Sequence, residues 1–196
     1  MDFAVVVGHR RMVRHFTTEP VSWATVERLV RTAQHAPSAG YSQGVSFVAV
    51  TDAALRQRMA EIAGEAWYTG VGHHPFLSEA PVHLVVCTSE AAYRARYREP
   101  DKRKPGQPER VWPVPYWHTD AGCALMLVLL AAVNEGLAAA FVGVRDPARL
   151  RALLGIPGDV LPVGVVLIGH GAPDKATRSA QRGRGPLTDV LHRERW

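Results

Sequence analysis

Arg10 to Phe16 reads R-R-M-V-R-H-F, with three arginines and one histidine before a closing aromatic side chain. Each guanidinium group presents paired donors in one plane and stays charged at any working pH, which suits a phosphate group. Cations at the C-terminal end of a helix are an alternative, because they favour the negative end of the helix dipole and otherwise face water. The stretch alone therefore predicts either an anion site or a solvated helix end.

The composition predicts one globular domain over residues 1–196, because 47% of the residues are hydrophobic and 21% are charged. We expect no membrane span, since the chain has no uncharged apolar run of about 18 residues. The first residues show no signal-peptide pattern, and Cys87 and Cys123 lie in apolar runs as small hydrophobic side chains. These observations predict a cytoplasmic protein without disulfides.

The net charge of +5 raises the question of nucleic-acid binding. The basic residues fall in separate clusters at 10–14, 94–104 and 178–195, and no nucleic-acid-binding motif accompanies them. Small anionic molecules explain the charge equally well. We therefore expect no nucleic-acid partner.

Hydrophobic spacing and capping residues predict an alternation of helices and strands. The expected helices are 2–10, 22–36, 52–65, 119–135 and a short one from Asp146, and the expected strands are 45–51, 82–87, 137–144 and 161–169. We expect Thr119 or Asp120 to cap the long apolar helix, which should lie at the centre of the fold or in a subunit interface. Residues 67–78 are expected to form a loop.

Two segments are irregular in sequence. Residues 89–118 are rich in charge, proline and glycine, and a connection of this length is typical of a functional lid or of disorder. Residues 171–196 form a basic C-terminal extension. The aromatic residues Trp112, Tyr116 and Trp117 indicate that the end of the first segment packs onto the rest of the protein.

Several motifs occur in a characteristic order. R-R-x-V-R-x-F precedes a helix, A-P-S-A-G-x-S-Q precedes a strand, and V-G-V and R-G-R-G-P-L follow far downstream. In this order the chain resembles the FMN-dependent nitroreductase family, from about Arg10 to Leu191. The resemblance implies an α+β fold with a mixed four- to five-stranded sheet flanked by helices. It also implies an intertwined homodimer with FMN at the subunit interface.

The resemblance also implies which residues bind FMN. Arginines would hold the phosphate and ribityl chain, a small-residue loop would border the flavin ring, generally from the partner subunit, and a backbone amide would face its reactive nitrogen. The implied residues are Arg10, Arg11, Met12, Arg14, Pro37, Ser38, Ala39, Gln43, Val142, Gly143, Val144, Arg182 and Arg184. The chain departs from the family pattern at Met12, where serine is usual, and at Tyr41, Gly44 and Val45.

The implied activity is hydride transfer from NADH or NADPH through FMN to a small acceptor such as a nitroaromatic or a quinone. The flavin supplies the chemistry, so we assign no acid or base to the protein, and the histidines show no metal-site motif. The pair His73–His74 could contact flavin or substrate, or could be a surface feature. Other flavin reactions, such as dehalogenation or flavin fragmentation, and a flavin-storage role without turnover remain alternatives.

Overall fold

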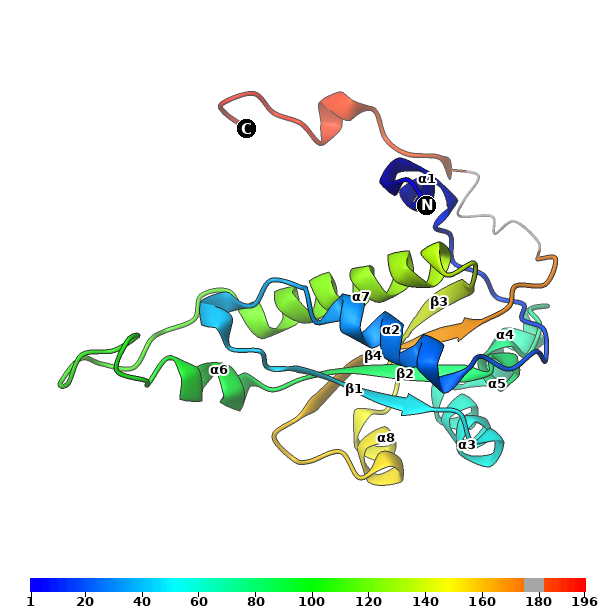
Figure 1. The fold of residues 1–196 in the computed structure, drawn as a ribbon, viewed down its shortest axis with the longest axis horizontal. Coiled ribbons are helices and arrows are strands. Elements are labelled where there is room, and N and C mark those ends of the chain that lie inside the picture. Colours follow the sequence, from blue (N-terminus) through cyan, green and yellow to red (C-terminus); the bar gives the residue numbers. More distant parts are fainter. Residues whose placement is uncertain (175–181) are drawn as a thin grey trace.

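The computed structural model describes residues 1–174 and 182–196 and contains a four-stranded sheet (Figure 1). The strand order is β1-β2-β4-β3. The strands are β1 (Val45–Val50), β2 (Val82–Thr88), β3 (Ala138–Gly143) and β4 (Leu161–Gly169). The four strands lie within about two residues of their expected positions.

All three strand pairings are antiparallel. The α+β class and the flanking helices are confirmed, but the pairings within the described sheet are not mixed as expected. The parallel contribution is one isolated bridge between Met12 and Ala139, where the N-terminal segment runs beside β3. Hydrophobic patterns identify strands but not their directions, because the direction depends on the connections between them.

The helices lie mostly where capping residues predict them. They are α1 (Phe3–His9), α2 (Trp23–Ala33), α3 (Ala53–Ala63), α4 (Glu65–Gly70), α5 (Phe76–Glu79), α6 (Glu90–Arg96), α7 (Tyr116–Asn134) and α8 (Pro147–Leu154). Short 3-10 turns occur at Ala39–Tyr41 and Leu187–Asp189. Ser22, Asp52 and Asp146 each accept a hydrogen bond from a backbone amide in the first turn of α2, α3 and α8.

Two expectations about helices are wrong. Residues 67–78 are not a loop, because they contain most of α4 and the start of α5, where Phe76 and Leu77 are completely buried. Asp120 does not cap α7, which begins at Tyr116 and has no side-chain cap. Asp120 instead lies in the second turn and is itself buried, so tertiary contacts rather than capping explain its position.

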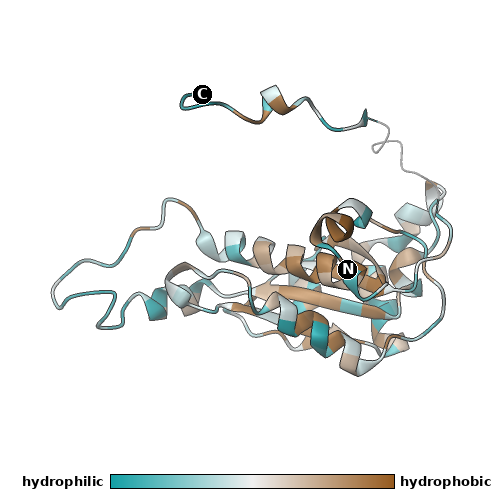
Figure 2. Cartoon of the chain, turned by 45° about the horizontal axis from the view of Figure 1, so that its top comes forward, coloured by the Kyte–Doolittle hydropathy of each residue, from teal (hydrophilic) through white to brown (hydrophobic). Residues whose placement is uncertain are grey.

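The helices cover both faces of the sheet (Figure 1). Leu84 and Val86 of β2 face a cluster formed with α2 and α7, whereas Val85 and Cys87 face a second cluster with α3, α5 and α8. Every residue of β2 is buried, as expected for a strand covered on both sides. The apolar sheet and the apolar side of α7 are visible together in Figure 2.

By length and composition alone, α7 is long and apolar enough to cross a membrane, with a mean hydropathy of 1.4 over 18 residues. Of that stretch, 44% is buried inside the protein. A single such helix is weak evidence for a membrane protein, since a core helix has the same composition. α7 packs on the sheet and on α2, which confirms the expected central position.

The expected lid segment is partly ordered by ion pairs. Its first part is α6, and the remainder projects from one end of the molecule (Figure 1). Arg96 pairs with Asp101 at 2.6 Å, and Arg98 pairs with Glu109 at 2.6 Å. Trp112 packs edge-on against Tyr97 at 4.6 Å between ring centroids. The function of this segment as a lid stays a prediction.

Candidate functional site

The arginine-rich stretch is extended and runs beside β3. α1 ends at His9 and Arg10 is its C-cap, so the helix-end interpretation holds for Arg10, whereas the residues after it are extended. The amide of Val13 donates to the carbonyl of Ala139 at 3.0 Å, and Phe16 forms an isolated bridge with Gly171. The backbone is therefore held on both sides of Arg14, and Arg11 directly precedes the bridge between Met12 and Ala139.

Met12 shows how this chain accommodates its departure from the family pattern. Its sulfur accepts a hydrogen bond from the amide of Phe141 at 3.3 Å, so the side chain is directed at β3. Its apolar part packs against the core cluster around α7. Any contact of Met12 with an anion would have to come from its backbone.

The three arginines carry positive charge without internal compensation. Within residues 1–174 and 182–196, no carboxylate forms an ion pair with Arg10, Arg11 or Arg14, whereas Arg28 pairs with Glu135 at 2.7 Å. Arg11 lines an open cavity of about 590 Å³ between α1, the end of α7 and Gly171. An unpaired guanidinium group beside an open cavity, with two more in the same stretch, fits a dianionic phosphate such as that of FMN.

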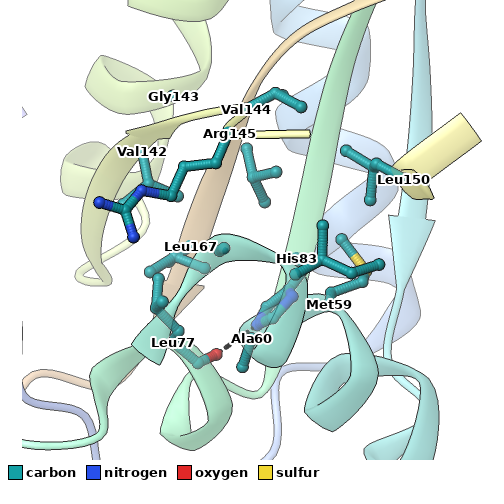
Figure 3. A pocket seen from close by; sticks show the side chains of 13 residues that line it. Met59, Ala60, Leu77, His83, Val142, Gly143, Val144, Arg145, Leu150 and Leu167 are labelled. Carbon is teal, nitrogen blue, oxygen red and sulfur yellow. Dashed lines mark hydrogen bonds between the residues drawn. The ribbon is translucent and has the colours of Figure 1, made fainter. Parts of the chain in front are cut away.

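The end of β3 offers an accessible backbone on the same strand that supports the arginines. Val142 is buried and lines a small cavity, together with Gly143 and Val144 (Figure 3). A Cβ atom added to Gly143 would meet nothing within 4 Å, so a flat ligand could approach its backbone. From Ala139 to Gly143 the strand spans roughly 13 Å, so the arginines beside Ala139 and the backbone at Gly143 lie within about the length of one flavin nucleotide.

The predicted loop at 37–43 has a strained backbone that is held by hydrogen bonds. Gly40, Tyr41 and Gln43 have φ values of 63°, 59° and 50°. The amide of Gln43 donates to the Ser38 hydroxyl at 2.7 Å. Left-handed non-glycine residues are costly and cluster at functional sites, so this geometry favours a binding role. The loop borders a hollow of about 230 Å³ that Pro37, Ser38 and Gln43 help to line.

Asp120 anchors this loop, although the sequence pattern indicated only a helix cap. Its Oδ2 atom accepts a hydrogen bond from the amide of Ala39 at 2.8 Å and another from the Tyr93 hydroxyl at 2.7 Å. Burial, followed by the bond to Asp120, raises the pKa of Tyr93. A Cβ on Gly44 would overlap the Tyr93 ring, which explains a glycine there. In the sequence, the only sign of this role was that Asp120 is a polar residue near the start of an apolar helix.

Within one chain the loop at 37–43 and the arginine stretch lie at opposite ends of α7. The loop is bonded to Asp120 near the start of the helix, whereas Arg11 lies with Val133 and Leu137 near its end. At about 1.5 Å of rise per residue, the helix from Asp120 to Asn134 is roughly 21 Å long. One chain therefore does not bring the arginines and the loop into a single site.

The comparison with known proteins matches this architecture. Residues 7–170 match the family described as "Nitroreductase family". This chain belongs to the nitroreductase family. A Bacillus subtilis (strain 168) protein named "FMN reductase [NAD(P)H]" is 30% identical over 186 residues, covering 94% of this chain and 70% of that protein. An Archaeoglobus fulgidus protein named "Putative NADH dehydrogenase/NAD(P)H nitroreductase" is 29% identical over 191 residues, covering 95% and 94%.

Solved structures agree with this family assignment. The structure of Bacillus megaterium NfrA2 has a TM-score of 0.78 and 26% identity, and covers all of this chain and 76% of that one. The NADPH:FMN oxidoreductase from Vibrio harveyi, solved with NAD⁺, has a TM-score of 0.77 and 22% identity, with coverages of 99% and 77%. At 22% identity, the similarity to the Vibrio harveyi structure establishes the fold alone.

The two arginines predicted in the C-terminal extension of this nitroreductase are exposed. Within the described residues, no hydrogen bond or ion pair joins 182–196 to 1–174, so Arg182 and Arg184 are not connected to the N-terminal arginines. Arg178 and the other residues of 175–181 lie outside the described part of the chain. The role of Arg182 and Arg184 in phosphate binding stays a prediction.

The small cavity at the end of β3 contains a buried histidine (Figure 3). His83 is 1% exposed, and its Nε2–H donates to the carbonyl of Leu77 at 2.5 Å. Burial lowers the pKa of His83 to about 4, and the nearby positive charge of Arg56 contributes in the same direction. The ring is therefore neutral in the folded protein at physiological pH.

We expect His83 to make this nitroreductase sensitive to acid. As the pH falls from about 6.5 to 4, the unfolded chain binds a proton at His83 that the folded chain does not, so the free energy of unfolding falls by about 3 kcal/mol. Urea denaturation at several pH values measures this loss. A His83→Leu variant, though less stable at neutral pH, should lack this part of the pH dependence. An unchanged dependence in the variant would contradict the assignment.

Proposed function

We propose that this protein transfers hydride from NADH or NADPH, by way of FMN, to a small acceptor such as a nitroaromatic or a quinone. The family and the names of its relatives make the chain an NAD(P)H-dependent flavin oxidoreductase that uses FMN. The acceptor and the residues that form the site are the parts proposed here.

One observation carries the proposal. The arginines without an ion-pair partner among the described residues lie beside β3, and the same strand ends at Gly143, whose backbone is accessible. Arg10, Arg11 and Arg14 would hold the phosphate of FMN, and Val142, Gly143 and Val144 would lie toward its ring system. When bound, FMN accepts a hydride and passes electrons to the acceptor. A backbone N–H near the ring would stabilise added negative charge without a titratable side chain, so the protein needs no acid or base of its own.

A second copy of the chain would complete the site. The loop containing Pro37, Ser38, Ala39 and Gln43 cannot reach the arginines of its own chain across the length of α7. Apolar side chains remain uncovered on α1 and at the middle of α7, since Phe3 is 72% exposed and Met126 is 44% exposed. Burying such surface stabilises a dimer, which would place one subunit's loop against the other's arginines.

The first test is the visible absorption spectrum of the purified protein, followed by anaerobic addition of NADH and, separately, NADPH. We expect a yellow protein whose flavin absorption bleaches with at least one reductant and returns when a nitroaromatic or a quinone is added. A yellow protein that neither bleaches nor turns over would favour flavin storage. A colourless protein that FMN does not reconstitute would contradict the proposed site.

Light scattering on the same sample tests the second copy. We expect a dimer in which the amount of bound FMN is proportional to the number of protein chains. A monomer that retains FMN and bleaches normally would show that one chain suffices. If reduction proceeds but neither acceptor class is consumed, a halogenated aromatic is the next candidate, because dehalogenation is one of the alternative flavin reactions, beside flavin fragmentation.

A further inference from the structure

Three side chains with metal-binding atoms, none of them among the proposed flavin contacts, converge beside the arginine stretch. One ligand atom of each of His15, His74 and Glu79 lies within 4.8 Å of the other two. His15 belongs to the arginine-rich stretch, His74 precedes α5, and Glu79 is the last residue of α5. We propose that these residues bind a divalent transition-metal ion, with zinc as the expected occupant.

The two imidazole rings lie face to face. They stack with centroids 3.6 Å apart and planes only 2° from parallel. Neighbouring ligands of a tetrahedral zinc ion lie roughly 3.3–3.5 Å apart, because each Zn–N bond is about 2.0–2.1 Å long. A zinc ion lies in the plane of each imidazole that binds it, so one of the two stacked rings must rotate out of the stack to coordinate the same ion. The ligand atoms, which lie within 4.8 Å of one another, would then close to that spacing.

The tautomer of His15 is suitable for a metal ligand. Its Nδ1 lies 2.8 Å from the carbonyl oxygen of Pro173, and a carbonyl can only accept, so Nδ1 carries the proton. The neutral ring then has its lone pair on Nε2. A backbone carbonyl bound to the other nitrogen is the arrangement that orients metal-ligating histidines in proteins.

Glu79 supplies the negative charge. Its Oε2 atom is buried and has no hydrogen-bond partner among the residues that the structure describes. A buried carboxylate oxygen without a partner is costly, and a bound cation would remove that cost. Two histidines and one carboxylate leave a coordination position for water, as in known three-ligand zinc sites.

The site would link two segments of the chain. The amide of Arg14, next to His15, donates to Asp174 at 2.8 Å, and its guanidinium group lies 6.0 Å from the centre of the Phe76 ring. A metal ion would thus fasten the arginine stretch to α5. The inference does not depend on the proposed function, because Arg10, Arg11 and Arg14 are not ligands.

The test uses the full chain, stripped of metal with a chelator and titrated with zinc in a calorimeter. We expect one ion per chain, and zinc binding at least about 100-fold weaker in His74→Ala and in Glu79→Gln, because each removes a ligand. The matched control is His73→Ala, which changes the neighbouring histidine and should bind zinc normally. Cobalt, added in place of zinc, should give visible bands that disappear in the same two variants.

Circular dichroism identifies variants that fail to fold. If His74→Ala does not fold, Glu79→Gln, which preserves the side-chain shape, is used in its place. Equal zinc binding in the wild type and both variants, or an equal loss in His73→Ala, would overturn the proposal. Arg14→Ala should lose FMN affinity but retain zinc. Failure of the flavin site and failure of the metal site are therefore distinguishable.

Discussion

Replacing Arg14 with alanine is expected to weaken FMN binding by about 100-fold. A hydrogen-bonded charge pair with a phosphate contributes about 1.5–3 kcal/mol, and each 1.4 kcal/mol corresponds to a tenfold change in affinity. No carboxylate among the described residues pairs with Arg14, so its charge is available to a ligand. Titration of the flavin-free protein with FMN, followed by flavin fluorescence, measures the change.

Riboflavin, which lacks the phosphate, is the internal control for this prediction. Arg14→Ala should bind riboflavin as the wild type does, because the missing guanidinium group acts on the phosphate. Arg14→Lys should recover only part of the FMN affinity, since lysine keeps the charge but not the planar pair of donors. Arg58→Ala, at an exposed position on α3, should bind FMN normally. An equal loss of FMN and riboflavin would indicate a structural effect instead.

Replacing Asp120 with alanine is expected to lower the free energy of unfolding by about 4 kcal/mol. The change leaves the Tyr93 hydroxyl and the Ala39 amide without their acceptor, and each buried orphaned donor costs about 1–3 kcal/mol. Because Ala39 belongs to the loop at 37–43, FMN affinity should fall as well. Urea denaturation at one fixed protein concentration measures the stability, since dimerisation would add a concentration dependence.

Two variants separate the contributions around Asp120. Tyr93→Phe removes one donor and leaves Asp120 bonded to Ala39, so it should cost about 1 kcal/mol. Asp159→Ala, at an exposed position, should change stability by less than about 0.5 kcal/mol. A loss in Asp120→Ala no larger than that in Asp159→Ala would mean that water replaces the carboxylate without cost.

Local patterns predicted most of the secondary structure. Ser22, Asp52 and Asp146 mark helix starts because their side chains satisfy backbone amides within the same turn. Val82 to Cys87 forms a buried strand because a continuous apolar run needs cover on both faces. These features depend on neighbours in sequence, so they can be recognised without the fold.

Residues 67–78 and the start of α7 could not be predicted in this way. α5 is a four-residue helix with no side-chain cap, and it is held by the burial of Phe76 and Leu77. Asp120 had the residue type of a cap, but its partners, Ala39 and Tyr93, are distant in sequence. Long-range contacts outweighed local propensity at both places.

By itself the sequence determined the family, the order of helices and strands, and the residue types suited to a phosphate, because these follow from local chemistry. The tertiary structure decided how those residues are grouped. It turned Met12 toward β3, separated the loop at 37–43 from the arginines by the length of α7, and brought together His15, His74 and Glu79. No spacing motif marks these three residues, since their proximity arises only when the strand pairing and α5 are both in place.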